Sequence, residues 1–150
     1  HDPESTALPK PSLKRPTCAP PLVLREEDVM TAWHQFGCAT AADAGGISTK
    51  EGVWILEMKD GRILSGSFAN DREEGQWNAW YAEGSRSRTW ATRGGVAEGL
   101  AIEWTPSGER ASERHYKNGS LDGSSIITYP DGVIRREVWR GGTLASESTE

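Results

Sequence analysis

Glycine recurs at a nearly constant spacing along most of this 150-residue chain. Four glycines are separated by 23, 24 and 24 residues, and another glycine follows nine residues after each, giving the pairs Gly52/Gly61, Gly75/Gly84, Gly99/Gly108 and Gly123/Gly132. Because glycine tolerates the positive φ angles of tight turns, paired glycines at this offset mark a strand, a turn and a return strand. The repeat therefore predicts consecutive β-hairpins.

The segments between the glycines have strand composition. Each unit begins with a run rich in β-branched or aromatic residues, namely VWILEM, QWNAWY, LAIEW and SSIITY. The return strands end near an aromatic residue, at Phe68, Trp90, Tyr116 and Trp139. The expected fold class is all-β, with antiparallel hairpin repeats forming an elongated twisted sheet over residues 52–150 and one short N-terminal helix.

Two other regions precede the repeats. Residues 1–24 hold six of the eight prolines and no aromatic residue, which predicts an extended, largely solvated arm. Residues 25–51 are expected to form a short helix over 25–36 and a loop, because acidic residues precede an apolar set at helical spacing. That set is Val29, Met30, Trp33 and Phe36.

Cys18 and Cys38 are the only cysteines. Cys18 lies in an arm with almost no core to bury a thiol, which favours a disulfide that staples the arm to the body over two unrelated buried thiols. A disulfide indicates an oxidising compartment. Because the chain also begins at His1 rather than Met, we expect a mature or trimmed protein of a bacterial periplasm.

Charge and motifs argue against several functions. The chain carries 17 Lys and Arg against 22 Asp and Glu, and no segment concentrates positive charge, which argues against nucleic-acid or direct membrane binding. No Gly-x-Ser-x-Gly, His-Glu-x-x-His or Walker-type motif is present, so we predict no catalytic residue, cofactor or metal site. His34, four residues before Cys38, and His115 are the alternatives for chemistry, and surface positions are favoured for both histidines.

Short stretches of the repeats carry a recognisable pattern: EGQW at 74–77, WYAEG at 80–84, YKNGSLDG at 116–123 and YPDG at 129–132. They resemble the MORN-type repeat, in the variant found in bacterial antitoxin-like and immunity proteins, over residues 52–145. The first unit departs from the pattern, with NDREE at 70–74 where a glycine turn is expected.

The resemblance implies a function. It points to a periplasmic immunity protein that binds a toxic secreted effector, most specifically a lipase or phospholipase of a type VI secretion system, and neutralises it by protein–protein occlusion. The alternative is a cell-envelope structural or lipid-associated module, as the name of the repeat suggests, and a hydrolase with a cryptic site at His115 ranks last. Neither the residues nor the resemblance indicates an oligomeric state.

A partner of this kind would be bound through side chains on the repeats. A single-layer sheet has two faces, so we expect most aromatic residues to be structural and a minority to contact the partner. The candidate partner-binding residues are Trp77, Trp80, Tyr81, Trp104, Tyr129 and Trp139, together with the acidic cluster Asp71, Glu73 and Glu74.

Overall fold

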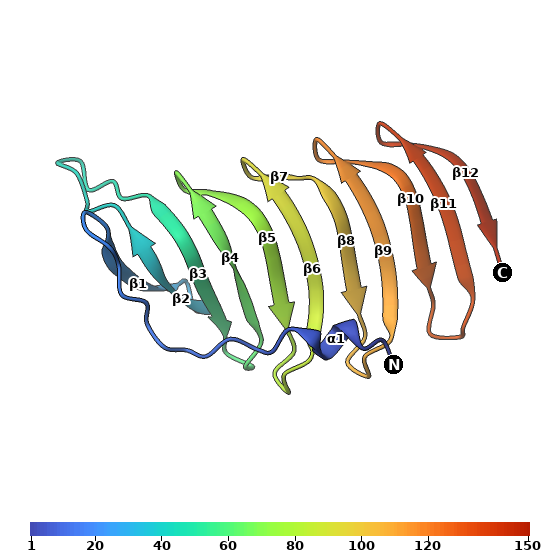
Figure 1. Cartoon of the computed structure of the whole chain (residues 1–150), viewed down its shortest axis with the longest axis horizontal. Helices are drawn as coiled ribbons and strands as arrows, with labels where there is room; N and C mark the ends of the chain where they lie inside the picture. Colours follow the sequence, from blue (N-terminus) through green and yellow to red (C-terminus); the bar gives the residue numbers. More distant parts are fainter.

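A computed structural model describes all residues from His1 to Glu150. Twelve antiparallel strands form one open sheet, in which successive strands lie side by side and the two-residue β7 pairs only with β6 (Figure 1). The predicted all-β hairpin architecture is therefore confirmed. No helix of the chain has the length and apolar character needed to cross a membrane.

The elements follow each other without crossovers. The single helix is α1 (Glu4–Ala7). The strands are β1 (Val23–Val29), β2 (Trp33–Ala39), β3 (Lys50–Met58), β4 (Ile63–Ala69), β5 (Arg72–Trp80), β6 (Arg86–Arg93), β7 (Val96–Ala97), β8 (Gly99–Trp104), β9 (Arg110–Lys117), β10 (Ser120–Thr128), β11 (Ile134–Arg140) and β12 (Thr143–Thr149).

The helix predicted over residues 25–36 is wrong. These residues form the hairpin β1–β2, in which Val29 pairs directly with Trp33 across a turn. Met30 makes that turn with a φ of 57°. Two residues four apart that face each other across a tight turn produce the same spacing as one turn of a helix. The one short helix of the chain lies instead in the arm, at Glu4–Ala7.

The repeat glycines behave as predicted. Both glycines of every predicted pair have positive φ, from 73° to 115°. The second glycine of each pair lies in a turn at the lower rim of the sheet as drawn in Figure 1. At the upper rim, the first repeat replaces the glycine turn by Asn70 and Asp71, which take φ angles of 50° and 68°. The same left-handed turn therefore connects the first repeat to the second.

The aromatic core lies on the face of the sheet away from the arm, which we call the ladder face. Trp54 meets Phe68 edge to face at 6.1 Å between ring centroids, and Phe68 meets Trp77 in the same way at 5.1 Å. Trp77 then stacks on Trp90 at 6.1 Å. The rings form a continuous ladder from β3 to β6, and each contact adds to the burial of its neighbours.

Two kinds of contact bury these aromatic rings, although the sheet has only one layer. The Trp77 ring lies directly over Gly66, where an added Cβ would come within 2.1 Å of the ring. Cations cover the other side of the aromatic rings, with the Lys50 ammonium 4.8 Å from the Trp54 centroid and the Arg88 guanidinium 4.5 Å from that of Trp90.

Candidate partner-binding surface

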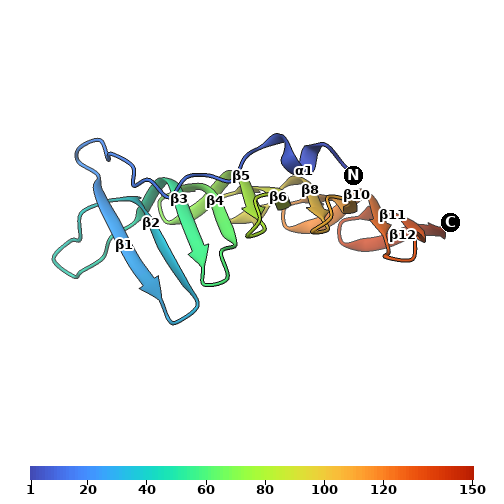
Figure 2. The same ribbon diagram turned by 90° about the horizontal axis from the view of Figure 1, so that it is seen from below.

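The N-terminal arm crosses the other face of the sheet, which we call the arm face, close to the lower rim (Figure 2). One end of the arm is held by the disulfide between Cys18 and Cys38 of β2, which confirms the predicted pairing. Towards its start, α1 lies against β6 of the second repeat and the lower turn of the third, and Ser5 is fully buried beside Gly108. The first ten residues of the arm are therefore docked on the sheet, although most of them stay exposed to solvent, as the sequence predicts for the arm.

Two tryptophans at the same position of successive repeats bind the arm. Trp80 donates its indole N–H to the carbonyl oxygen of Leu8 at 3.0 Å. Trp104 donates its indole N–H to the Asp2 carboxylate at 2.7 Å. Both side chains are buried, with 3% and 2% of their surface exposed.

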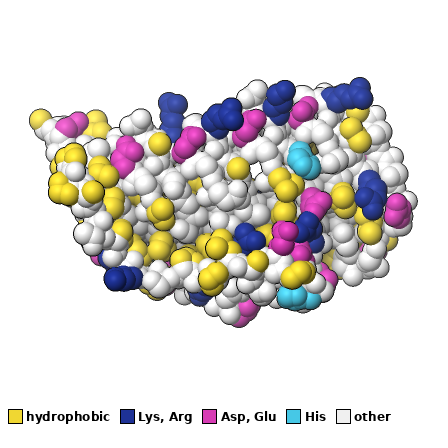
Figure 3. Space-filling model, viewed as in Figure 1, with side chains coloured by type: hydrophobic (Ala, Val, Ile, Leu, Met, Phe, Trp, Pro, Cys, Tyr) yellow, Lys and Arg dark blue, Asp and Glu magenta, His cyan; other side chains and the backbone are white.

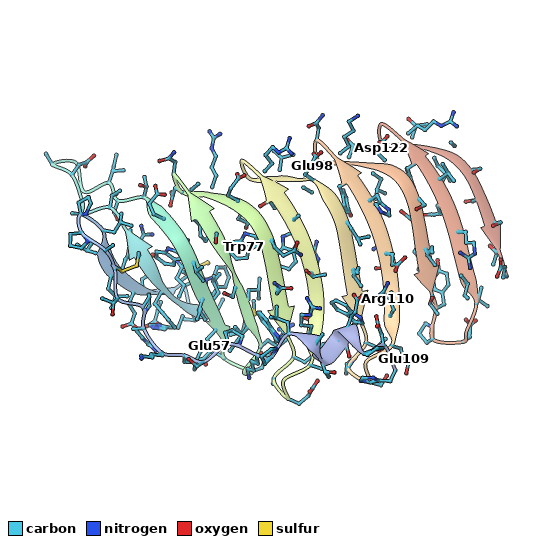
Figure 4. All side chains as sticks on the ribbon, viewed as in Figure 1. Glu57, Trp77, Glu98, Glu109, Arg110 and Asp122 are labelled. Carbon is cyan, nitrogen blue, oxygen red and sulfur yellow. A yellow bond between two sulfur atoms is a disulfide. The ribbon has the colours of Figure 1, made fainter.

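Two arginines, again one from each of these repeats, complete the contact. Arg86 donates to the carbonyl oxygen of Glu4 at 2.9 Å, and its guanidinium lies 4.7 Å from the centroid of the Trp104 ring. Arg110 donates to the Asp2 carboxylate at 2.7 Å (Figure 4 labels Arg110 beside α1). Burial alone would raise the pKa of Asp2, but hydrogen bonds from Trp104 and Arg110 outweigh it and hold the pKa below its ordinary value.

We call the set Trp80, Arg86, Trp104 and Arg110 the arm groove. A cavity of about 500 Å³ lies between the lower turns of the third and fourth repeats and shares Arg110 with the groove. Arg110 and Tyr129 line this cavity, and Tyr129 is exposed. No residue of the arm lines this cavity.

The upper half of the arm face is open. The strand register places Val53, Leu100 and Val138 on this face, because they share it with Ile55, Ile102 and Arg136 by alternation. Their exposed fractions are 59%, 41% and 39%. Figure 3 shows this face, with hydrophobic side chains gathered along the lower half and scattered over the upper half. We call Val53, Leu100 and Val138 the open shelf.

Charged side chains alternate in sign along the upper rim, above the open shelf (Figure 3). Each repeat supplies one acidic side chain that accepts a backbone N–H from the neighbouring upper turn, as Glu98 accepts that of Asn118 at 2.8 Å and Asp122 that of Gly141 at 3.0 Å (Figure 4). Each repeat also supplies an exposed cation that makes no ion pair within 4 Å. These cations are Arg72, Arg93, Lys117 and Arg140.

Three of the predicted partner-binding residues are buried in the structure. Trp77 is part of the ladder over Gly66, and Trp80 and Trp104 are covered by the arm, so none of the three is accessible with the arm in place. Burial follows from contacts with segments remote in sequence.

Of the other predicted aromatic residues, Tyr81 is half-buried and donates its hydroxyl to the Trp104 carbonyl. Trp139 is half-buried, with its indole N–H on Glu137 at 3.0 Å. Tyr129 is exposed and stays a prediction as a partner-binding residue.

The predicted acidic cluster is spread along the upper rim. Asp71 accepts the backbone N–H of Lys50 at 3.1 Å, and Glu74 accepts that of Gly94 at 2.6 Å. Glu73 lies in β5 opposite Phe68. Two of the three carboxylates therefore have a structural partner in a neighbouring turn.

The sequence reasoning missed the arginines of the arm groove and the cations of the upper rim. A signal for them exists, because Arg86 and Arg110 lie 24 residues apart at the same place in the repeat. The rim cations are separated by 21, 24 and 23 residues, so the fold gathers charges that no single segment concentrates.

The remaining candidates for chemistry have ordinary partners. Cys38 is in the disulfide, so it forms no thiolate pair with His34. His34 contacts Asp28 at 2.8 Å and Glu26 at 3.1 Å, and hydrogen bonds to these two carboxylates raise its pKa. His115 contacts the backbone carbonyl of Ser124. No group of three or more His, Cys, Asp or Glu side chains is close enough to hold a metal ion.

These features define a class of protein: a single-layer sheet of hairpin repeats that carries a docked, disulfide-anchored arm on one face. No protein-family model matches the chain, and no curated protein matches its sequence.

Proposed function

We propose that this chain is an immunity protein that binds a toxic secreted effector, a lipase or phospholipase of a type VI secretion system, and neutralises it by occluding its active site. The observation that carries the proposal is the open shelf, where Val53, Leu100 and Val138 each expose an apolar side chain on the same face of the sheet. Exposed apolar groups beside a polar rim are the composition of a protein–protein interface.

The upper rim adds electrostatic complementarity. Its four cations have no ion-pair partner, whereas carboxylates beside them accept backbone hydrogen bonds such as that from Gly94 to Glu74. Unpaired cations bordering an apolar surface accelerate association with a partner of opposite charge. The effector is thus expected to carry acidic residues around its active-site entrance.

The disulfide is a further observation that supports the proposal. The disulfide between Cys18 and Cys38 is compatible with a protein that folds outside the cytosol. A periplasmic immunity protein meets its effector there, which is the location that the resemblance to MORN-type immunity proteins implies.

The test is affinity capture from the native periplasm, identification of the bound protein, and an assay of its activity with and without this chain. Leu100→Asp places a charge in the open shelf, and Leu144→Asp changes a similarly exposed leucine of β12 on the ladder face. We expect Leu100→Asp to weaken binding about tenfold or more and Leu144→Asp to leave it within about twofold. Capture of no toxin, with cells lacking the chain still resistant to sister-cell attack, would overturn the proposal.

An anionic lipid surface is the second candidate, and the four unpaired rim cations are the observation that favours it. Each cation near such a surface contributes about 1 kcal/mol of attraction. Flotation with phosphatidylglycerol vesicles tests it, with phosphatidylcholine vesicles as the control. Binding to the anionic vesicles that is lost in Arg93→Glu with Lys117→Glu would favour the lipid-associated module over the immunity protein.

A further inference from the structure

We propose that the arm groove is a binding site for an extended acidic peptide segment of a partner, and that residues 1–10 occupy this site in cis. Its ligand carries two carboxylates about three residues apart. The inference rests on the proposed function only in taking the effector as the source of that segment.

The groove residues serve the arm rather than the hairpins. The positions of Trp80 and Trp104 in the repeat are occupied by Glu57 in the first repeat and Thr128 in the fourth. These two repeats form the same hairpins without a tryptophan at this place. The arginine position behaves in the same way, with Ile63 and Ile134 in the outer repeats. Tryptophan and arginine therefore occur together only in the two repeats against which residues 1–10 lie.

The groove residues donate hydrogen bonds, and residues of the arm accept them. At the third repeat, the indole N–H of Trp104 and the Nε–H of Arg110 both donate to the same carboxylate oxygen of Asp2, each at 2.7 Å. A carboxylate accepting two donors, one of them charged, forms the strongest contact of the arm. Trp104 and Arg110 thus form one subsite of the groove, and this subsite selects an acidic side chain.

The equivalent subsite at the second repeat is only partly satisfied. Trp80 donates to the carbonyl oxygen of Leu8, so the arm places a neutral acceptor there. The Nε atom of Arg86 is buried and has no hydrogen-bond partner. Because an unpaired buried donor is costly, a ligand with a carboxylate at this position would gain a contact that the arm lacks. The arm is therefore an incomplete ligand of its own groove.

The spacing of the two subsites sets the form of the ligand. Successive repeats are two strands apart, which is about 9.5 Å across a β-sheet. A polyproline II segment rises about 3.1 Å per residue with three residues per turn, so side chains three residues apart lie on one side about 9.3 Å from each other. A segment of the pattern Asp-x-x-Asp in this conformation places one carboxylate in each subsite.

The arm can leave without breaking the sheet. Its first ten residues make one backbone–backbone hydrogen bond to the rest of the chain, in which the Asp2 N–H donates to the Gly108 carbonyl. Its other sheet contacts run through side chains, such as Lys10 to the Ala82 carbonyl at 2.9 Å. Departure would expose two indoles and two guanidinium groups, which are the residue types that dominate binding energy at interfaces.

The experiment measures binding of two fluorescent peptides, GPDPPDPG and its amide counterpart GPNPPNPG, to three forms of the protein. The first is the full chain, and the second lacks residues 1–10. The third carries Asp2→Asn and Glu4→Gln, which remove the two arm carboxylates that pair with Arg110 and keep the full length of the arm. We expect the two forms with a removed or weakened arm to bind the acidic peptide at least tenfold more tightly than the full chain. The arm in cis acts at an effective concentration on the order of millimolar, which is the reason for this difference.

Two controls make the result specific. The amide peptide is expected to bind at least tenfold more weakly than the acidic one. In the chain without residues 1–10, Arg86→Gln should abolish binding, whereas Arg88→Gln, which alters an arginine of the ladder face, should leave it unchanged. Equal binding of the two peptides, or no binding to either arm variant while circular dichroism shows the native sheet, would overturn the proposal.

The effector assay separates the two proposals. A chain that neutralises the effector equally well with and without Arg86→Gln, although that substitution abolishes peptide binding, overturns the groove as the effector site and leaves the immunity function standing. A chain that binds the acidic peptide but does not neutralise the effector overturns the immunity function instead.

Discussion

Replacing Gly66 by alanine tests how a one-layer sheet buries tryptophan. The Trp77 ring lies where the new Cβ would be, at 2.1 Å, so the ring must move away. Overpacking of this kind costs about 2 kcal/mol. The moving ring also weakens its contacts with Phe68 and Trp90, at about 1 kcal/mol each, while alanine recovers under 1 kcal/mol through its lower backbone entropy in the unfolded chain. We expect Gly66→Ala to lower the free energy of unfolding by about 3 kcal/mol.

Urea denaturation followed by far-ultraviolet circular dichroism measures this loss, with a drop in Tm of about 6–12 °C in a thermal scan. Gly45→Ala is the matched control, because the nearest atom to its added Cβ is 3.4 Å away, and it should change stability by less than about 0.5 kcal/mol. In a Trp77→Leu background the cost of Gly66→Ala should fall by about 2 kcal/mol. An unchanged cost in that background would refute the packing argument.

Three further perturbations have defined outcomes. Reduction of the disulfide, which joins positions 20 residues apart, should lower the free energy of unfolding by about 3 kcal/mol, measured by denaturation with and without dithiothreitol. Hydrogen bonds to Asp28 and Glu26 raise the pKa of His34. The contribution of His34 to stability is therefore complete below pH 6.5 and is lost as the pH rises through the raised pKa. The same decline in stability in a chain with His34→Gln would contradict the assignment to His34. Glu98→Ala removes the acceptor of one upper turn and should cost about 1 kcal/mol by calorimetry, whereas Glu103→Ala, at an exposed position, should cost under about 0.5 kcal/mol.

The hairpin sheet is predictable from the sequence because its determinants are local. The requirement for positive φ at a turn acts on one residue, so glycines such as Gly84 and Gly108 mark the turns without knowledge of the rest of the fold. The turn of Asn70 and Asp71 shows the limit of a glycine pattern, since both residues adopt the left-handed region without being glycine.

The first hairpin and the buried tryptophans were not predictable in this way. Val29 and Trp33 have a spacing that suits a helix as well as a hairpin. The hairpin forms because β2 also pairs with β3, a contact that the local sequence does not reveal. The burial of Trp77 depends on Gly66 in the neighbouring strand, and that of Trp80 on a carbonyl 72 residues away. Each of these contacts follows from strand register or from the docking of the arm. Neither of these causes produces a repeating pattern in the sequence.

The path of the arm also governs how the molecule unfolds. In an array of hairpins each unit touches only its neighbours, so loss of order spreads one unit at a time and the ends open first. The arm acts as a strap across this array, fastened covalently at Cys38 of β2 and by hydrogen bonds at Trp104 of β8. Hairpins between these two points are joined into one cooperative unit, since none of them can separate fully while the strap holds. The hairpin β11–β12 lies outside the strap, and its last strand is exposed along its whole length, so it opens independently of the rest.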